Sequence, residues 1–170
     1  MIVKDEKALV TWNTEHLGSD QDVIVGRFID LRDGKESSFL SDDIILTEST
    51  YQNNNPKVKL FNNNGFLSWV TKSSGSDPYY TGAWKLIKVN WDVENIQVGE
   101  THKTDFMGNP YDIQGITQTS SQNILIWEET DGTTTSIKAK IINWRIDERN
   151  LFKAPLIERD YSVKAKILSE

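Results

Sequence analysis

A tryptophan within a short apolar segment occurs three times at nearly equal spacing, and no other feature restricts the possible folds as much. Trp12, Trp69 and Trp127 are 57 and 58 residues apart. The first two are followed at the same distance by Gly-Ser-Asp, and the third by a shorter Thr-Asp-Gly loop. Equal periods of this length are typical of chains built from repeated supersecondary units, so we expect three units.

The local sequence pattern within each unit predicts strands. The segments "GFLSWVT" and "DVIVGRFID" are rich in β-branched and aromatic residues and are bounded by turn residues. No stretch shows a sustained helical spacing of apolar residues. We predict four antiparallel strands per unit, which in the second unit lie at 58–61, 66–71, 81–91 and around 100–106. The tryptophan strand is expected to be buried on both faces, with Gly-Ser-Asp in its hairpin loop.

The repeats predict one domain over 1–170, with units at about 1–55, 56–109 and 110–159. An extra strand is expected at 160–170, because "RDYSVKAKI" has the pattern of the first strand of a unit. This strand would begin a fourth unit and would present an unpaired edge, which invites pairing with another chain.

Units of four antiparallel strands at this period favour β-propeller blades. Three blades are too few for a ring, so we expect two chains to join in a six-bladed homodimer. A β-trefoil, which also has three four-stranded repeats, is the alternative fold, and a third option is that the sequence is a fragment of a larger ring.

The segment from Asn54 to Val89 resembles the blade repeats of large secreted bacterial adhesin-like and calcium-repeat proteins. The matching features are an Asn-Pro, a short strand, a strand ending in Trp, a Gly-Ser-Asp loop and a following strand. "GFLSWVTKSSGSD" and "VIVGRFIDLRDGK" carry the resemblance best, whereas the third repeat has a shortened loop. The resemblance implies a bacterial propeller-type repeat protein, and it implies no activity.

Composition excludes several classes of partner and site. A net charge of −6, with Lys and Arg interspersed among acids, argues against nucleic-acid binding. The absence of cysteine excludes disulfides and thiolate metal ligands. No apolar run approaches 18 residues and no signal peptide is visible, so we expect a soluble chain without a membrane span and assign no compartment.

Catalytic and metal-binding patterns are weak. The two histidines, His16 and His102, lie at non-equivalent positions, and no nucleophile or phosphate-binding motif occurs. The pairs Glu15 with Asp30, and Glu128 with Asp131, are of the kind that arises by chance among 25 acids. We expect no enzyme activity, no cofactor and no metal. The aspartates of the loops are interpreted as turn residues rather than calcium ligands: Asp20, Asp22, Asp77 and Asp131.

One aromatic cluster, found only in the second repeat, is the candidate ligand-binding site. The segment "DPYYTGAWK" places three aromatic side chains between an acid and a base. Aromatic rings bind the apolar face of a sugar, and charged groups bind its hydroxyls. The candidate residues are Asp77, Tyr79, Tyr80, Trp84 and Lys85.

These observations favour a non-catalytic binding module, either a carbohydrate-binding lectin-like protein or a protein-interaction propeller. A structural protein that builds an oligomer or a surface layer is the alternative, and a glycoside hydrolase is the third class. The aromatic cluster occurs once rather than three times, which argues against a lectin with repeated sites.

Overall fold

The structure is a computed structural model of the 170-residue chain, and it places most of the strands predicted by the repeats. The described residues are 1–15, 21–32, 38–50, 52–72, 75–76, 80–104, 113–119, 122–130, 135–143 and 157–163.

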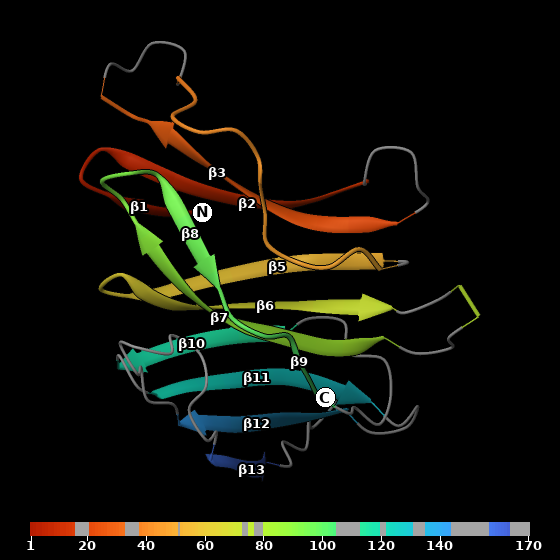
Figure 1. Cartoon of the computed structure of the whole chain (residues 1–170). Coiled ribbons are helices and arrows are strands. Elements are labelled where there is room, and N and C mark those ends of the chain that lie inside the picture. Colours follow the sequence, from red (N-terminus) through yellow and green to blue (C-terminus); the bar gives the residue numbers. More distant parts are fainter. Residues whose placement is uncertain are drawn as a thin grey trace, which may run out of the picture.

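The strands form three antiparallel sheets, which follow one another along the chain (Figure 1). Sheet A consists of β1 (Ile2–Lys4), β2 (Lys7–Glu15), β3 (Asp22–Asp30) and β4 (Ile44–Ile45). Sheet B consists of β5 (Gln52–Phe61), β6 (Asn64–Lys72), β7 (Thr81–Asn90), β8 (Asn95–Val98) and β9 (His102–Thr104). Sheet C consists of β10 (Ile113–Thr119), β11 (Gln122–Thr130), β12 (Thr135–Asn143) and β13 (Ile157–Val163).

The prediction of an antiparallel all-β fold is confirmed. The described residues include no helix, and strands that are consecutive in the chain are neighbours in each sheet, except that β9 pairs with β7 rather than with β8. Within the ranges that the structure describes, the strands form three separate sheets and close into no barrel or ring. A β-trefoil needs strands of all three repeats in one closed barrel, so these strands do not form the alternative fold.

Two tight hairpins show how local sequence sets the strands. In sheet A, Asp5 and Glu6 join β1 to β2 with φ angles of 47° and 63°, the positive values that a two-residue turn of the hairpin type requires. In sheet B, the turn between β5 and β6 has Asn62 at φ 56°. A Cβ on the following Gly65 would lie 2.4 Å from the carbonyl oxygen of Lys59, so only glycine fits there.

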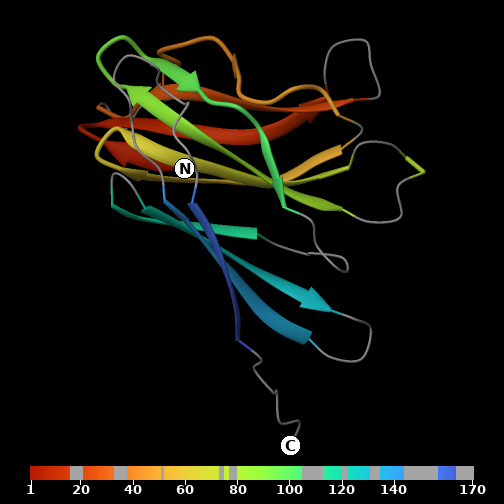
Figure 2. The ribbon, with the colours of Figure 1, turned by 60° about the horizontal axis from the view of Figure 1, so that its bottom comes forward.

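Sheet B is the centre of the stack, because both of its faces are covered. Seven consecutive residues of β6, from Gly65 to Thr71, are buried, as predicted for the tryptophan strand. One face, which includes Leu67 and Trp69, packs against Leu9 and Phe28 of sheet A. The other face packs against sheet C through a cluster of buried residues, namely Phe66, Val70, Trp84, Leu86, Leu125, Trp127 and Ile142. Figure 2 shows the same succession of sheets from a second direction.

The last described strand differs from the prediction. Ile157–Val163 pairs with β12 along its whole length, from Asn143 with Ile157 to Ile137 with Val163. It is therefore the fourth strand of sheet C and not the first strand of a fourth unit. Its pattern resembles that of a first strand because both are edge strands, with a partner on one side only.

The unit boundary after residue 55 also differs. Strand β5 begins at Gln52 and continues through Asn55 and Pro56, where the register with β6 shifts between Asn54 and Lys57. Asn55 has φ 54°, and proline is tolerated at such a bulge because it has no N–H to pair. The Asn-Pro pair thus marks a bulge within the first strand rather than a turn ahead of it.

The prediction places one irregular fourth strand around 100–106, and the structure has two short strands on this edge of β7, with only β9 inside that range. Strand β8 pairs with the end of β7, at Ile87–Asn90, and β9 pairs with its beginning, at Gly82–Trp84. A search of the described residues for a helix long and apolar enough to cross a membrane finds none.

Candidate ligand-binding cavity

A cavity of about 460 Å³ lies where the segment after sheet A meets one end of sheet B. Its lining residues are Glu48, Thr50, Asn53, Trp69, Thr71, Thr101 and Lys103. The first two come from the connection between β4 and β5, and the others from β5, β6 and the region of β9. The size lies within the range of small-molecule sites, which is roughly 300 to 1,000 Å³.

Asn53 fixes one wall of the cavity. Its side chain is buried, with 1% exposure, and its Nδ2 donates to the carbonyl oxygens of Asp22 and Glu48 at 2.7 and 3.3 Å. Its Oδ1 accepts a hydrogen bond of 3.0 Å from the indole Nε1 of Trp69. Removal of a buried group with several partners leaves them unsatisfied, so this amide holds the connection between the sheets in place.

Threonine hydroxyls provide a second polar wall. The hydroxyls of Thr50 and Thr71 lie 3.0 Å apart, and each donates a hydrogen bond of 3.1 Å to the backbone carbonyl oxygen of Gln52. The side chain of Gln52 accepts a hydrogen bond of 2.7 Å from the hydroxyl of Tyr80. These bonds connect the start of β5 with β6 and with the beginning of β7.

A carboxylate and one lysine of the lining give the cavity its charge, and a second lysine pairs with that carboxylate from the sheet interface. Glu48 accepts from the Nζ of Lys85 at 3.1 Å and from the hydroxyl of Thr101 at 2.7 Å. The side chain of Lys85 is 4% exposed and that of Glu48 is 67% exposed, so the ion pair runs from the sheet interface to solvent. Lys103 lines the same cavity and is exposed.

Two opposing effects set the pKa of Glu48. Burial raises it, and the hydrogen bonds from Thr101 and Lys85 lower it, with the net result that the pKa lies below its ordinary value of 4.5. The carboxylate is therefore ionised at neutral pH and offers hydrogen-bond acceptors at the cavity.

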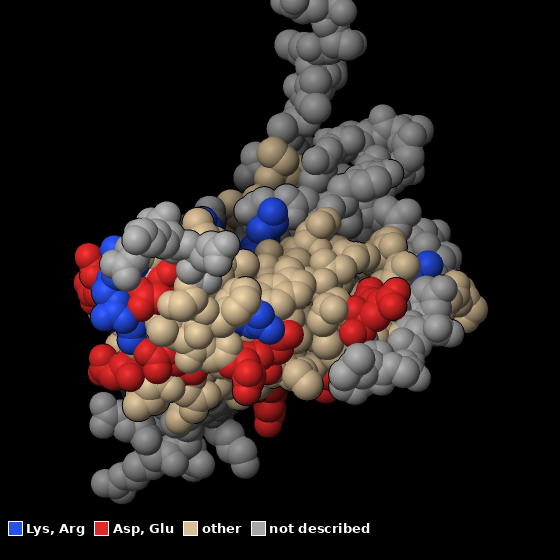
Figure 3. Space-filling view, turned by 90° about the horizontal axis from the view of Figure 1, so that it is seen from above, with Lys and Arg blue, Asp and Glu red and all other residues tan. Residues whose placement is uncertain are grey.

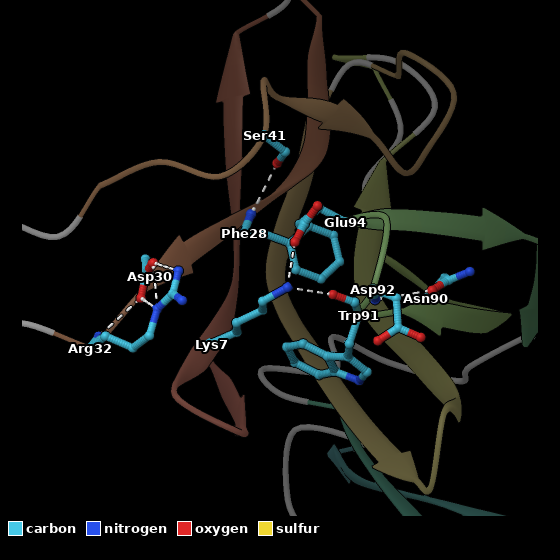
Figure 4. A network of polar contacts seen from close by, with 9 residues as sticks. All are labelled: Lys7, Phe28, Asp30, Arg32, Ser41, Asn90, Trp91, Asp92 and Glu94. Atoms are coloured by element: carbon cyan, nitrogen blue, oxygen red, sulfur yellow. Dashed lines mark hydrogen bonds and ion pairs between the residues drawn. The ribbon is translucent and has the colours of Figure 1, made fainter.

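A second polar junction connects sheets A and B at the opposite end of β7 (Figure 4). The Nζ of Lys7 in β2 donates a hydrogen bond of 2.8 Å to the backbone carbonyl oxygen of Trp91, and it forms an ion pair with Glu94. The ring of Trp91 meets that of Phe28 edge-on, at 5.5 Å between centroids. This junction binds the turn after β7 to sheet A.

The aromatic site predicted from the sequence is not assembled as expected. Asp77 and Tyr79 lie outside the described residues. Tyr80 is partly buried, with the ammonium of Lys72 at 5.5 Å from its ring. Trp84 and Lys85 are adjacent in β7, so their side chains point to opposite faces of sheet B.

Trp84 belongs to the core rather than to an exposed platform. It has no exposed surface, and its ring stacks between Phe66 at 5.0 Å and His102 at 4.2 Å. This aromatic ladder crosses β6, β7 and β9 on the face toward sheet C. The prediction overlooked it because strand alternation, and not proximity in the sequence, determines which side chains share a face.

Of the carboxylate pairs considered for catalysis, Glu15 with Asp30 is not brought together, and Asp131 of the other pair lies outside the described residues. Glu15 and Asp30 lie at opposite ends of the hairpin of β2 and β3, opposite Asp22 and Lys7 respectively. A hydrogen bond from Arg32 lowers the pKa of Asp30 to about 2. The part of the chain that the structure describes contains no group of three or more metal-binding side chains.

The register of the sheets exposes one repeated feature that sequence spacing did not. Arg27, Lys85 and Lys140 pair with Val10, Leu67 and Leu125, the residues two positions before the three tryptophans. Each sheet thus has a cation at the same position on the same face as its tryptophan. The three cations are present in the sequence, but the hairpin loops differ in length. The number of residues between tryptophan and cation therefore differs from repeat to repeat, and a fixed spacing does not align them.

Comparison of the chain with protein-family models, with curated proteins and with solved structures gives no match.

Proposed function

We propose that this protein is a non-catalytic binding module, which takes a small polyhydroxyl ligand of about monosaccharide size in the cavity at Glu48. The observation that supports this most strongly is the combination in one cavity of an ionised carboxylate, a lysine and three threonine hydroxyls. Sugar hydroxyls both donate and accept, so a site with acceptors at Glu48 and donors at Lys103 matches them.

The hydrogen bonds and burial of the lining residues support binding rather than catalysis. Glu48 is held by Thr101 and Lys85, and Asn53 uses both ends of its amide for the fold. Trp69 forms part of the wall but is 2% exposed, so it serves as a fluorescent reporter and not as a stacking surface. The proposal therefore moves the lectin-like site from the aromatic cluster to the junction of sheets A and B.

Saturation-transfer NMR with a panel of monosaccharides tests the proposal, with Trp fluorescence as a second measurement. We expect one or more sugars to bind, and we expect Lys103→Ala to weaken binding roughly tenfold, because a hydrogen bond to a charged donor contributes about that much. Lys88→Ala is the matched control, since Lys88 is an exposed lysine of β7 that does not line the cavity. Equal weakening by both variants, or no binding by any sugar of the panel, would contradict the proposal.

A structural role in an oligomer is the second candidate function, and a different observation favours it. Sheets A and C are the ends of the stack, and each has a face that no other sheet of the chain covers (Figure 1). Two chains joined through these faces would give the six-bladed ring expected from the sequence.

A further inference from the structure

The three tryptophans occupy the same position in their sheets, but only two of them have a sheet to pack on. Trp69 of sheet B is 2% exposed and packs against sheet A. Trp127 of sheet C is 8% exposed and packs against sheet B. Each tryptophan therefore faces the sheet that precedes its own in the chain.

Trp12 is on the face of sheet A that points away from sheet B. Leu9 packs toward sheet B, and alternation along β2 turns Val10 and Trp12 to the other side. Trp12 is only partly buried, and its ring has the guanidinium of Arg27 at 5.8 Å from its centroid. The other two tryptophans each face a described sheet, whereas the structure describes no sheet on the side that Trp12 faces.

The face around Trp12 has the composition of a sheet interface. Ile45 lies beside Val25 on this face and is 54% exposed, and Val3 lies beside Ala8 and is also 54% exposed. Seen from the sheet A end, the molecule has a surface of residues other than Lys, Arg, Asp and Glu, with a few basic and acidic groups within it and others toward its margins (Figure 3). Exposed apolar side chains that share one face of a sheet are typical of interaction sites.

The cation on this face, Arg27, has a counterpart at the same position in sheet B. Lys85, its counterpart in sheet B, is buried against the segment that follows sheet A, where Glu48 pairs with it. Arg27 pairs instead with Asp43 of its own sheet, at 2.6 Å, and both side chains remain partly exposed. The free face of sheet A thus carries the complete tryptophan-and-cation pattern of the covered face of sheet B.

The outward face of sheet C is complementary to the Trp12 face of sheet A. The outward side chains of β11 and β12 are apolar and partly exposed: Ile124, Ile126, Ala139, Ile141 and Ile137. Ile124 and Ile141 occupy the positions of Phe66 and Leu86, which receive sheet C on sheet B. Sheet C therefore offers a receiving face that none of the tryptophans within the described strands fills.

We propose that a second copy of this chain completes both faces, with sheet C of one copy packed on sheet A of the other and Trp12 in the contact. This inference rests on the assembly role proposed above and is independent of the ligand cavity. A pair of such contacts, related by a twofold axis, closes a ring of six sheets. Six lies within the four to eight sheets of closed propellers, whereas three copies would give nine.

Sedimentation of the full chain without ligand tests the inference. We expect a dimer of twice 19.5 kDa. Ile45→Asp on the sheet A face and Ile137→Asp on the sheet C face should each shift the equilibrium to the monomer by at least tenfold. Both positions are exposed, at 54% and 46%, so the fold should survive, as circular dichroism would verify. Val93→Asp is the matched control, because Val93 is 64% exposed in the turn after β7 and should leave the dimer intact.

Mixing the two variants determines the geometry of the contact. Each variant keeps one intact face, so a head-to-tail contact predicts that the mixture recovers a dimer that neither variant forms alone. A monomeric wild-type chain would overturn the inference. If both variants remain dimeric, the protein still assembles, but these two faces do not form the contact and the inference is overturned. If the chain is a monomer that binds sugar, the inference is overturned and the cavity proposal stands.

Discussion

The repeated tryptophans have different surroundings although their sequences look alike. Trp69 and Trp127 are buried between sheets, whereas Trp12 lies on a free face of sheet A. Sequence analysis predicts three equivalent core positions, and the structure makes them equivalent in register but unequal in burial. A sequence cannot show this difference, because burial depends on which sheet lies opposite and not on the local pattern.

Trp69→Ala should lower the free energy of unfolding by about 3 to 5 kcal/mol, because it empties a core site and leaves Asn53 Oδ1 without its donor. Trp12→Ala should lower it by much less in dilute protein, since the side chain is already partly exposed. Urea unfolding of both variants at low concentration measures the difference. Equal losses of stability would contradict the assignment of Trp12 to a free face.

The depressed pKa of Glu48 predicts a specific pH dependence. A carboxyl whose pKa is lower in the folded than in the unfolded chain contributes stability above its unfolded value, and that contribution disappears as the pH falls through the folded pKa. Stability should therefore decline below about pH 4.5, and Glu48→Gln should reduce the decline. A carbon-detected NMR titration should place the pKa of Glu48 below 4.5 and show that Thr101→Val raises it. A wild-type value at or above 4.5 would exclude the assigned hydrogen bonds.

At the scale of elements, alternation and turn chemistry predicted much of what the structure contains. The apolar run ending in Trp69 is a strand buried on both faces, and β9 lies within the range predicted for the fourth strand. Both features follow from residues close together in the chain, whereas β8 was not predicted. The polar cluster at Asn53 does not, because its partners Asp22 and Trp69 are far away in the sequence.

Differences in hairpin-loop length explain why sequence spacing did not reveal the repeated cation. The cation follows the tryptophan by 15 residues in the first repeat, by 16 in the second and by 13 in the third, so a fixed period misaligns it. Strand register removes the difference and brings Arg27, Lys85 and Lys140 to one position. The candidate pair of Trp84 and Lys85 failed for a related reason, since neighbours in a strand point to opposite faces.

Truncation of the chain after Arg159 tests the assignment of β13. The cut removes the half of the strand that pairs with Ile137–Lys140 and leaves that edge of β12 open. We expect amide hydrogens of β12 to exchange faster, because their carbonyl partners are lost, while those of β6 keep their protection. Unchanged exchange in β12 would show that β13 does not pair there in solution.

At the scale of the molecule, the described sheets form a stack in which the central sheet packs against another described sheet on both sides, and each outer sheet does so on one side. Sheet B supplies residues to both apolar clusters, and sheets A and C supply residues to one each. The two internal contacts follow one rule, in which the tryptophan of a sheet packs on the sheet before it. Applied once more, that rule is the basis of our proposal that a second copy packs next to Trp12.

The surroundings of Trp12 across a dilution series test this rule most directly. In protein labelled with 5-fluorotryptophan, ¹⁹F resonances assigned by Trp→Phe variants report solvent contact through the shift between H₂O and D₂O. The account predicts that Trp69 and Trp127 show almost no shift at any concentration, and that the shift of Trp12 disappears as the protein concentration rises and copies associate. A Trp12 resonance that keeps its solvent shift at every concentration, or a Trp69 resonance that shows one, would contradict the account.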